Sequence, residues 1–183
     1  MKKFLSIIFL ILMWAGTIGA VYEIDAARNA SIHNNRGVNL LKEKYYYGAI
    51  KEFEIAIQLN PDTQATATYY NNLGKTYLII GYPNLAEESF KFALSKNAAN
   101  FEFYQNLVTS YKQQNKLQKE LKKAMNDKKN VSKVIAGLIL IEMEKTESGI
   151  NMLDEFCFDN PDMILTKGVR TYINQTASNK IRF

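Results

Sequence analysis

The chain has 183 residues, of which 47% are hydrophobic, and it contains only three Pro and nine Gly. This length suits one domain or one short repeat array, and the composition argues against long disordered stretches. The net charge of +5 is mostly local, because eight Lys and two acidic residues lie in residues 112–133. The rest of the chain lacks the basic character of a nucleic-acid-binding protein, so we expect no nucleic-acid partner.

Residues 1–21 have the layout of an export signal. Lys2 and Lys3 precede an uncharged run over residues 4–21, which ends in a segment rich in small residues. A basic start, an apolar centre and a small-residue end are typical of a signal peptide. The run also reaches the length of the shortest membrane spans, so an uncleaved membrane anchor is the alternative. Both readings place the rest of the chain outside the cytoplasm: periplasmic, secreted, or anchored in the membrane.

A pattern of Gly, Ala and aromatic residues recurs over residues 30–161. It is clearest over residues 67–100, where Tyr-x-x-Leu-Gly-x-x-Tyr is followed by Ala-x-x-x-Phe-x-x-Ala. Recurrence at a spacing of about 34 residues predicts stacked helix pairs. The pattern positions are Gly37, Ala49, Phe53, Ala56 and Pro61 in the first repeat, Tyr70, Leu73, Gly74, Tyr77, Ala86, Phe90 and Ala93 in the second, and Tyr104, Leu107 and Tyr111 in the third.

This pattern resembles the tetratricopeptide repeat (TPR), a helix–turn–helix unit of about 34 residues. The resemblance implies an all-α solenoid of three to four helix pairs, in which each pair buries its apolar face against its neighbours. In such a pair, Gly74 and Ala86 allow the two helices to approach closely, and Phe90 fills the space between them.

The third repeat departs from the pattern. Glu120 and Ala124 stand where the family has Ala and Phe. In addition, only 29 residues separate Val108, at the glycine position of the third repeat, from Gly137 at the same position of the fourth. We therefore expect a short third repeat or a slip of register. The apolar run over residues 134–141 is too short to span a membrane, so it is predicted to be a buried repeat helix.

Two segments flank the predicted array of residues 30–161. Residues 22–29 are expected to be a linker. Residues 162–183 are expected to form a capping helix over residues 163–175, which solenoids need to cover their last apolar face, followed by a mobile tail from residue 176.

Side-chain amides recur at the positions that line the concave face in the TPR family. These are the fifth and sixth residues of each repeat, and here they are Asn or Gln in three successive repeats. An amide offers two donors and one acceptor, which suit an extended peptide without requiring a charge, although Asn is also common there for structural reasons. We predict a solvent-facing peptide-binding groove that includes Asn34, Asn35, Val38, Asn71, Asn72, Lys75, Gln105, Asn106, Thr109 and Lys112.

No catalytic constellation is recognisable. His33 is the only histidine and Cys157 the only cysteine, and neither has a partner at metal-ligand spacing. We expect His33 to be a surface or capping residue and Cys157 a buried small residue. The sequence has no phosphate-binding loop and no nucleophile motif, so we expect no enzyme activity, no cofactor, no metal and no small-molecule substrate.

Together these features predict a non-catalytic scaffold or adaptor, in the cell envelope or secreted, that binds a protein segment in its concave groove. Two alternatives stay open. One is a membrane-tethered structural subunit that contacts partners or lipid through its outer faces, and the other is an accessory subunit of a separate enzyme. The lysine-rich residues 112–133 are expected to be a solvated face, with an acidic partner or anionic lipid headgroups as the functional alternatives.

Overall fold

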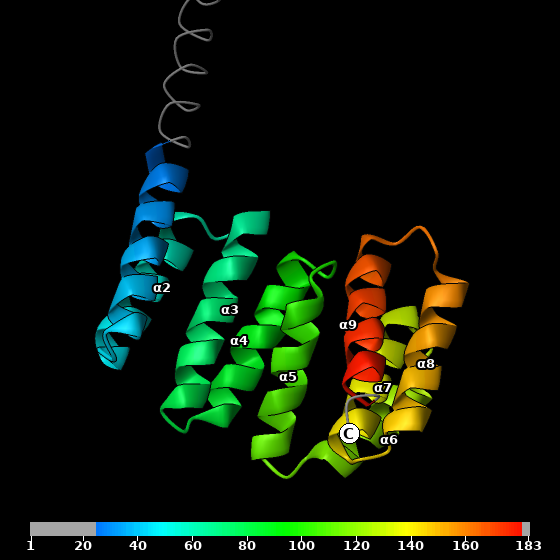
Figure 1. Ribbon diagram of the computed structural model, residues 1–183. Helices are drawn as coiled ribbons and strands as arrows, with labels where there is room; N and C mark the ends of the chain where they lie inside the picture. Colours follow the sequence, from blue (N-terminus) through cyan, green and yellow to red (C-terminus); the bar gives the residue numbers. More distant parts are fainter. Residues whose placement is uncertain (1–24, 181–183) are drawn as a thin grey trace, which may run out of the picture. The chain divides into compact units, whose positions relative to one another are not determined.

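A computed structural model of the protein describes residues 25–180 (Figure 1). It divides after Thr63 into two compact parts, here named the N-terminal unit (residues 25–63) and the C-terminal unit (residues 64–180), and each is described by itself. The predicted export signal or anchor of residues 1–21 lies outside the described residues.

The N-terminal unit is one helix pair. Its first helix includes residues 25–42, and α2, Tyr46–Leu59, follows after a tight turn. A Cβ atom on Gly37 would lie 2.6 Å from a ring carbon of Phe53, so a glycine is needed for this close approach. Phe53, Ala49 and Ala56 are fully buried, which confirms the packing predicted for the first repeat. The predicted linker is wrong from residue 25 on, because residues 25–29 are helical.

The C-terminal unit consists of seven further helices, and residues 25–180 contain no strand. The helices are α3 (Gln64–Ile79), α4 (Pro83–Lys96), α5 (Phe101–Gln113), α6 (Leu117–Asn126), α7 (Asn130–Glu142), α8 (Thr146–Asp159) and α9 (Ile164–Lys180). They form the pairs α3–α4, α5–α6 and α7–α8 (Figure 1), which confirms the all-α class and the predicted pairing.

The same backbone turn joins the two helices of every pair. In the turn after α3, Tyr82 N–H donates to Tyr77 O and Gly81 N–H to Leu78 O. This is the Schellman motif, which satisfies the last carbonyls of a helix and requires one residue in the left-handed conformation. The turns after residues 42, 113 and 142 repeat the same hydrogen bonds. The left-handed residues of the four turns are Lys44, Gly81, Asn115 and Glu144.

Small residues set the distance between the helices of a pair. A Cβ atom on Gly74 would lie 2.6 Å from a ring carbon of Phe90, which is fully buried. In the pair α7–α8, a Cβ atom on Gly149 would lie 2.6 Å from the carbonyl oxygen of Gly137. A larger residue would force these helices apart, since protein interiors are close-packed. The glycines thus have the packing role that the repeat pattern predicted.

The third pair, α5–α6, is the irregular one, as predicted. Its second helix, α6, has 10 residues, whereas α4 and α8 have 14 each. Glu120, at the position of a repeat alanine, is only 8% exposed and accepts a hydrogen bond from Lys123. A cavity of about 130 Å³ lies beside Ala124, which stands at the position of a repeat phenylalanine. Its lining is Tyr111, Glu120, Lys123, Ala124, Asp127, Ser132 and Ile135.

The turn between α5 and α6 is held to α4 by polar contacts. Gln114 Nε2 donates to Glu87 Oε2 at 2.9 Å, and Lys116 Nζ lies 3.1 Å from the same oxygen. Desolvation raises the pKa of Glu87, but hydrogen bonds from Lys91, Gln114 and Lys116 outweigh it and lower the pKa to about 2. The short third pair is therefore fixed to its neighbour by a charged contact as well as by apolar packing.

The last helix, α9, covers the apolar end of the array. Leu165, Val169 and Ile173 are buried, and they recur at the helical spacing of one face. This agrees with the predicted capping role. The predicted end of the helix is wrong, since α9 continues past Gln175 to Lys180 and the first part of the expected tail is helical.

The apolar run at residues 134–141 is a repeat helix, as predicted. It belongs to α7, in which Val134 and Ile139 are fully buried. Among the helices of residues 25–180, none has the length and apolar character that crossing a membrane needs.

Candidate functional site

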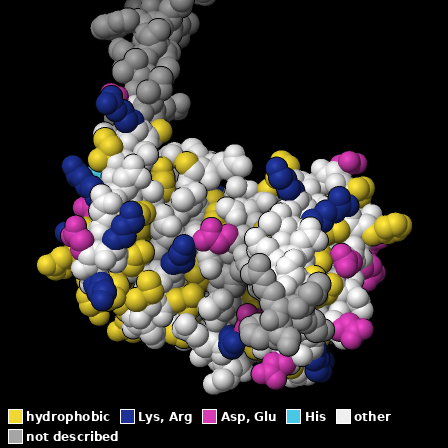
Figure 2. Space-filling view, viewed as in Figure 1, with side chains coloured by type: hydrophobic (Ala, Val, Ile, Leu, Met, Phe, Trp, Pro, Cys, Tyr) yellow, Lys and Arg dark blue, Asp and Glu magenta, His cyan; other side chains and the backbone are white. Residues whose placement is uncertain are grey.

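The first helices of the pairs line one face of the C-terminal unit. α3 contacts α5, and α5 contacts α7, so these helices share a side of the array. α9 lies on the same side and contacts both α8 and α5 (Figure 1). We name this side the inner face. Figure 2 views the inner face and shows a largely uncharged surface between α3 and α9.

A pocket of about 430 Å³ opens between α5 and α9 on the inner face. The two helices meet closely at its base, where a Cβ atom on Gly168 would lie 2.7 Å from Phe101 Cβ. The rings of Phe101 and Tyr172 are 5.3 Å apart and tilted by 50°. The lining is Phe101, Gln105, Ile164, Lys167, Gly168, Thr171, Tyr172 and Gln175. It combines two aromatic rings, two side-chain amides and one ammonium group.

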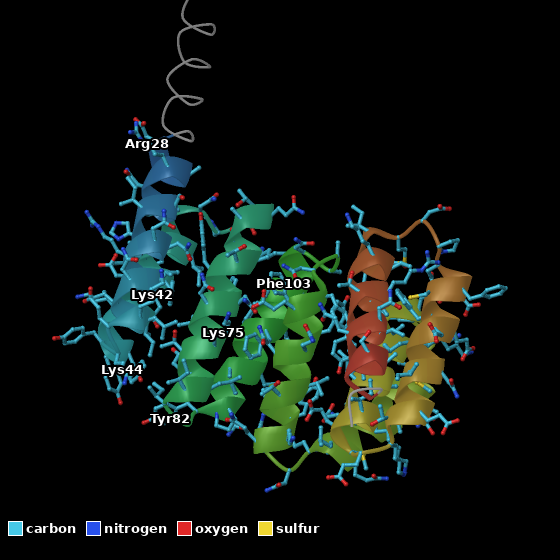
Figure 3. The ribbon with its side chains drawn as sticks, viewed as in Figure 1. Arg28, Lys42, Lys44, Lys75, Tyr82 and Phe103 are labelled. Atoms are coloured by element: carbon cyan, nitrogen blue, oxygen red, sulfur yellow. The ribbon has the colours of Figure 1, made fainter. Side chains whose placement is uncertain are left out.

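A polar network occupies the neighbouring part of the inner face, between α3 and α5. Asn106 Nδ2 donates to Asn71 Oδ1 at 2.8 Å, and both amide nitrogens lie 3.5 Å from Glu102 Oε1. Lys75 Nζ lies 3.1 Å from the same carboxylate oxygen. Figure 3 shows Lys75 on α3 and Phe103 on the adjacent α5. Desolvation raises the pKa of Glu102, but contacts with Lys75, Asn71 and Asn106 outweigh it and lower the pKa.

The predicted amide positions of the C-terminal unit therefore differ in accessibility. The prediction that Asn71 faces solvent is wrong, because Asn71 is only 3% exposed and its Oδ1 accepts a hydrogen bond from Asn106. Asn72 and Asn106 are half-buried, while Gln105 lines the α5–α9 pocket. The hydrogen bond between Asn71 and Asn106 joins α3 to α5, which is the structural role that Asn can have at these positions.

The remaining predicted groove residues are also accounted for. Thr109 is exposed and its hydroxyl donates to Gln105 O, while Lys112 forms an ion pair with Glu142 at 2.8 Å. In the N-terminal unit, Asn35 is exposed, and Asn34 and Val38 are half-buried. Their part in binding stays a prediction.

The sequence did not reveal four residues that define the inner face. Phe101, Gly168 and Tyr172 build the pocket, and Glu102 organises the amide network. Glu102 stands one helical turn before Asn106, a spacing that places both side chains on one side of a helix. No comparable signal connects α9 to α5, because their residues are far apart in the chain.

His33 and Cys157 both have structural roles: His33 contacts a neighbouring helix and Cys157 is buried in the core. His33 Nδ1 lies 2.7 Å from Glu52 Oε2, which joins the two helices of the N-terminal unit. Cys157 is buried as predicted, and desolvation raises the pKa of its thiol. Within residues 25–180, His, Cys, Asp and Glu form no group of three that could hold a metal ion.

Comparison with known proteins identifies the repeat. Residues 67–99, which include most of α3 and all of α4, match the family model described as a tetratricopeptide repeat. The sequence has no significant match among curated proteins. The chain is an all-α, TPR-like solenoid that ends in a capping helix.

Solved structures with similar folds include three proteins of low sequence identity to this chain. A tetratricopeptide repeat protein from Parabacteroides merdae has a TM-score of 0.52 and 15% identity, covering 83% of this chain and 61% of that one. The structure of pilF from Pseudomonas aeruginosa has a TM-score of 0.51 and 16% identity, covering 80% of this chain and 68% of that one. The MamA protein has a TM-score of 0.50 and 20% identity, covering 80% of this chain and 87% of that one. At such identities the similarity shows the fold alone.

Proposed function

We propose that this protein is a non-catalytic scaffold that binds an extended segment of a partner protein on its inner face. The observation that carries the proposal is the pocket between α5 and α9, with its aromatic rings and its amides. Phe101 and Tyr172 suit an apolar anchor side chain of the partner, and Gln105 and Gln175 suit its backbone groups. Lys167 favours a carboxylate at the pocket edge.

The network of Lys75, Glu102 and Asn106 extends this surface toward α3. Its charges are already paired, so it adds hydrogen-bonding groups without a strong net charge. A partner segment lying along α5 would meet the apolar pocket at one end and the polar network at the other. This arrangement favours a short peptide of mixed character over a highly charged one.

A peptide-display experiment tests the site. Random peptides are selected on the full-length protein, and the dissociation constants of the selected peptides are then measured for two variants. Thr171→Trp fills the pocket from an exposed position of α9, and Asn151→Trp adds the same ring at an exposed position of α8 outside the pocket.

We expect Thr171→Trp to weaken binding about ten-fold or more, equivalent to about 1.4 kcal/mol, and Asn151→Trp to leave it unchanged. Equal affinity of both variants for all selected peptides would remove the α5–α9 pocket from the binding site. Thermal unfolding of each variant, followed by circular dichroism, checks that neither ring disturbs the fold.

We further propose that the protein works in the cell envelope or is secreted. Lys2 and Lys3, followed by the uncharged residues 4–21, support this setting. A reporter that is active only outside the cytoplasm, fused after Phe183, should be active. The mass of the mature chain then separates cleavage near Ala20 from an uncleaved anchor, and an active cytoplasmic reporter at the same place would contradict the proposal.

A further inference from the structure

The eight lysines of residues 112–133 divide into a paired set and an unpaired set. The paired lysines contact acidic side chains, in the pairs Lys112–Glu142, Lys116–Glu87, Lys123–Glu120, Lys133–Glu155 and Lys133–Asp159. The other four are exposed and form no ion pair among the described residues. We name these four residues, Lys119, Lys122, Lys128 and Lys129, the α6 basic surface.

The fold gathers this surface at one place. Lys122 lies on the side of α6 opposite the buried Glu120, as the period of 3.6 residues requires, and the exposed Lys119, three residues earlier, is its neighbour on the helix surface. Lys128 and Lys129 follow directly in the connection to α7. Met125, on the same helix, is 58% exposed. The result is a basic helix with an exposed apolar side chain among its lysines.

The acidic residues of this segment do not neutralise the surface. The charge of Glu120 is matched by Lys123. The carboxylate of Asp127 accepts hydrogen bonds from the Lys129 backbone N–H at 3.1 Å and from the Ser132 hydroxyl at 2.9 Å, and these bonds lower its pKa. One carboxylate therefore stands beside four ammonium groups, and the surface keeps a net positive charge.

The position of α6 decides which kind of partner fits. α6 is the second helix of its pair, so it lies away from the inner face formed by α3, α5 and α9. The cavity next to α6 is lined by Glu120 and Ala124, on the inward side of the helix. A partner peptide would meet a ridge there instead of a groove. A flat, deformable surface can contact such a ridge along its length.

We propose that the α6 basic surface binds the anionic headgroups of a lipid bilayer. Lysines near an anionic membrane contribute about five-fold each to affinity, and an amphipathic helix with basic and apolar exposed residues is suited to the interface. Residues 4–21, an uncharged run next to two lysines, would bring the chain to a membrane. The lipid contact uses a different side of the C-terminal unit from the proposed peptide site, so either proposal can fail alone.

Lysine acylation measured by mass spectrometry tests this contact on the full-length chain. The protein is mixed with vesicles of phosphatidylglycerol or of phosphatidylcholine at low salt. Residues 4–21 can associate with both lipids, whereas the lysines distinguish the anionic one. We expect acylation of Lys119, Lys122, Lys128 and Lys129 to fall about five-fold or more on phosphatidylglycerol alone, and to recover in high salt because screening shortens the Debye length. Acylation of the exposed Lys51 and Lys167 should not change.

Variants with equal loss of charge provide the control. Changing Lys119, Lys122, Lys128 and Lys129 together to Gln should lower the preference for phosphatidylglycerol over phosphatidylcholine, measured by co-sedimentation at limiting lipid, by a factor on the order of several hundred, because each lysine contributes about five-fold. The same change at the exposed Lys42, Lys44, Lys51 and Lys167 should have a much smaller effect.

Equal acylation of the four lysines on both lipids would overturn the proposal, as would equal effects of the two quadruple variants. The proposal would also be overturned if soluble polyglutamate protected the four lysines from acylation and vesicles did not. That result would assign the surface to an acidic protein segment.

Discussion

Substitution of Gly74 by Ala tests how the helices of a pair are held together. The added methyl carbon would lie 2.6 Å from one ring carbon of Phe90 and 2.9 Å from two others. Phe90 is fully buried, so its ring cannot move into solvent. Overpacking of this kind costs about 1–3 kcal/mol, and the better helix propensity of Ala returns at most about 1 kcal/mol. We expect a net loss of roughly 1–2 kcal/mol in the free energy of unfolding.

Gly48→Ala is the matched control. Gly48 also lies within a helix, α2, but a Cβ atom there would meet its nearest neighbour, Leu40 Cδ1, at 3.4 Å, an ordinary contact. The gain in helix propensity is then unopposed, so this variant should be as stable as the parent or more stable by up to about 1 kcal/mol. The same chemical change should thus have opposite signs at the two glycines.

Urea unfolding followed by circular dichroism measures both effects, and a double-mutant cycle identifies the cause. Phe90→Leu removes the ring atoms nearest Gly74, so Gly74→Ala should cost about 1 kcal/mol less in that background. If the two changes are additive within about 0.5 kcal/mol, or if Gly74→Ala is as stable as the parent, the close contact between Gly74 and Phe90 does not limit the packing of α3 on α4.

Three further changes follow from local geometry and charge. Glu144→Gly should stabilise the chain by about 1 kcal/mol in thermal unfolding, because Glu144 has a φ of 64° that Gly adopts without strain. Glu87→Gln should destabilise at pH 7; because the folded-state pKa of Glu87 is depressed to about 2, this difference should shrink as the pH falls from about 4.5 toward 2, which unfolding across that range will show. Asn106→Ala should cost about 1 kcal/mol in urea unfolding, since it removes the 2.8 Å donor to the buried Asn71, and an unchanged stability would favour a role in binding alone.

The helix pairs were predictable because their packing depends on residues at fixed spacing. Gly74, Ala86 and Phe90 lie within one repeat, and each contributes to a contact that the repeat itself specifies. The same logic identified the irregular pair, since the Glu120 and Ala124 substitutions are visible in the sequence. The extent of α9 was less predictable, because its last turns carry few apolar residues and have a weak helical pattern.

The inner face was predictable only in part, because contacts between repeats depend on how each pair is rotated relative to the next. The amide positions fall on the first helices, as expected, yet Asn71 is taken up by Asn106 from the following helix. Sequence register alone cannot separate an amide that faces solvent from one that bonds to a neighbour. Here the amide nitrogens of Asn71 and Asn106 and the ammonium group of Lys75 all contact the same carboxylate oxygen of Glu102, a contact that the repeat pattern does not include.

The contact of α9 with α5 involves a helix of the irregular third pair. In a regular solenoid each helix pair contacts only its immediate neighbours, whereas here the capping helix reaches back past α7 to Phe101. Between α5 and α7 lie the features that depart from the repeat: the short helix α6 and the small Ala124 beside a cavity. The pair that has lost one large residue of the repeat pattern is therefore also the pair whose first helix, α5, lines the α5–α9 pocket, the site to which we assign binding.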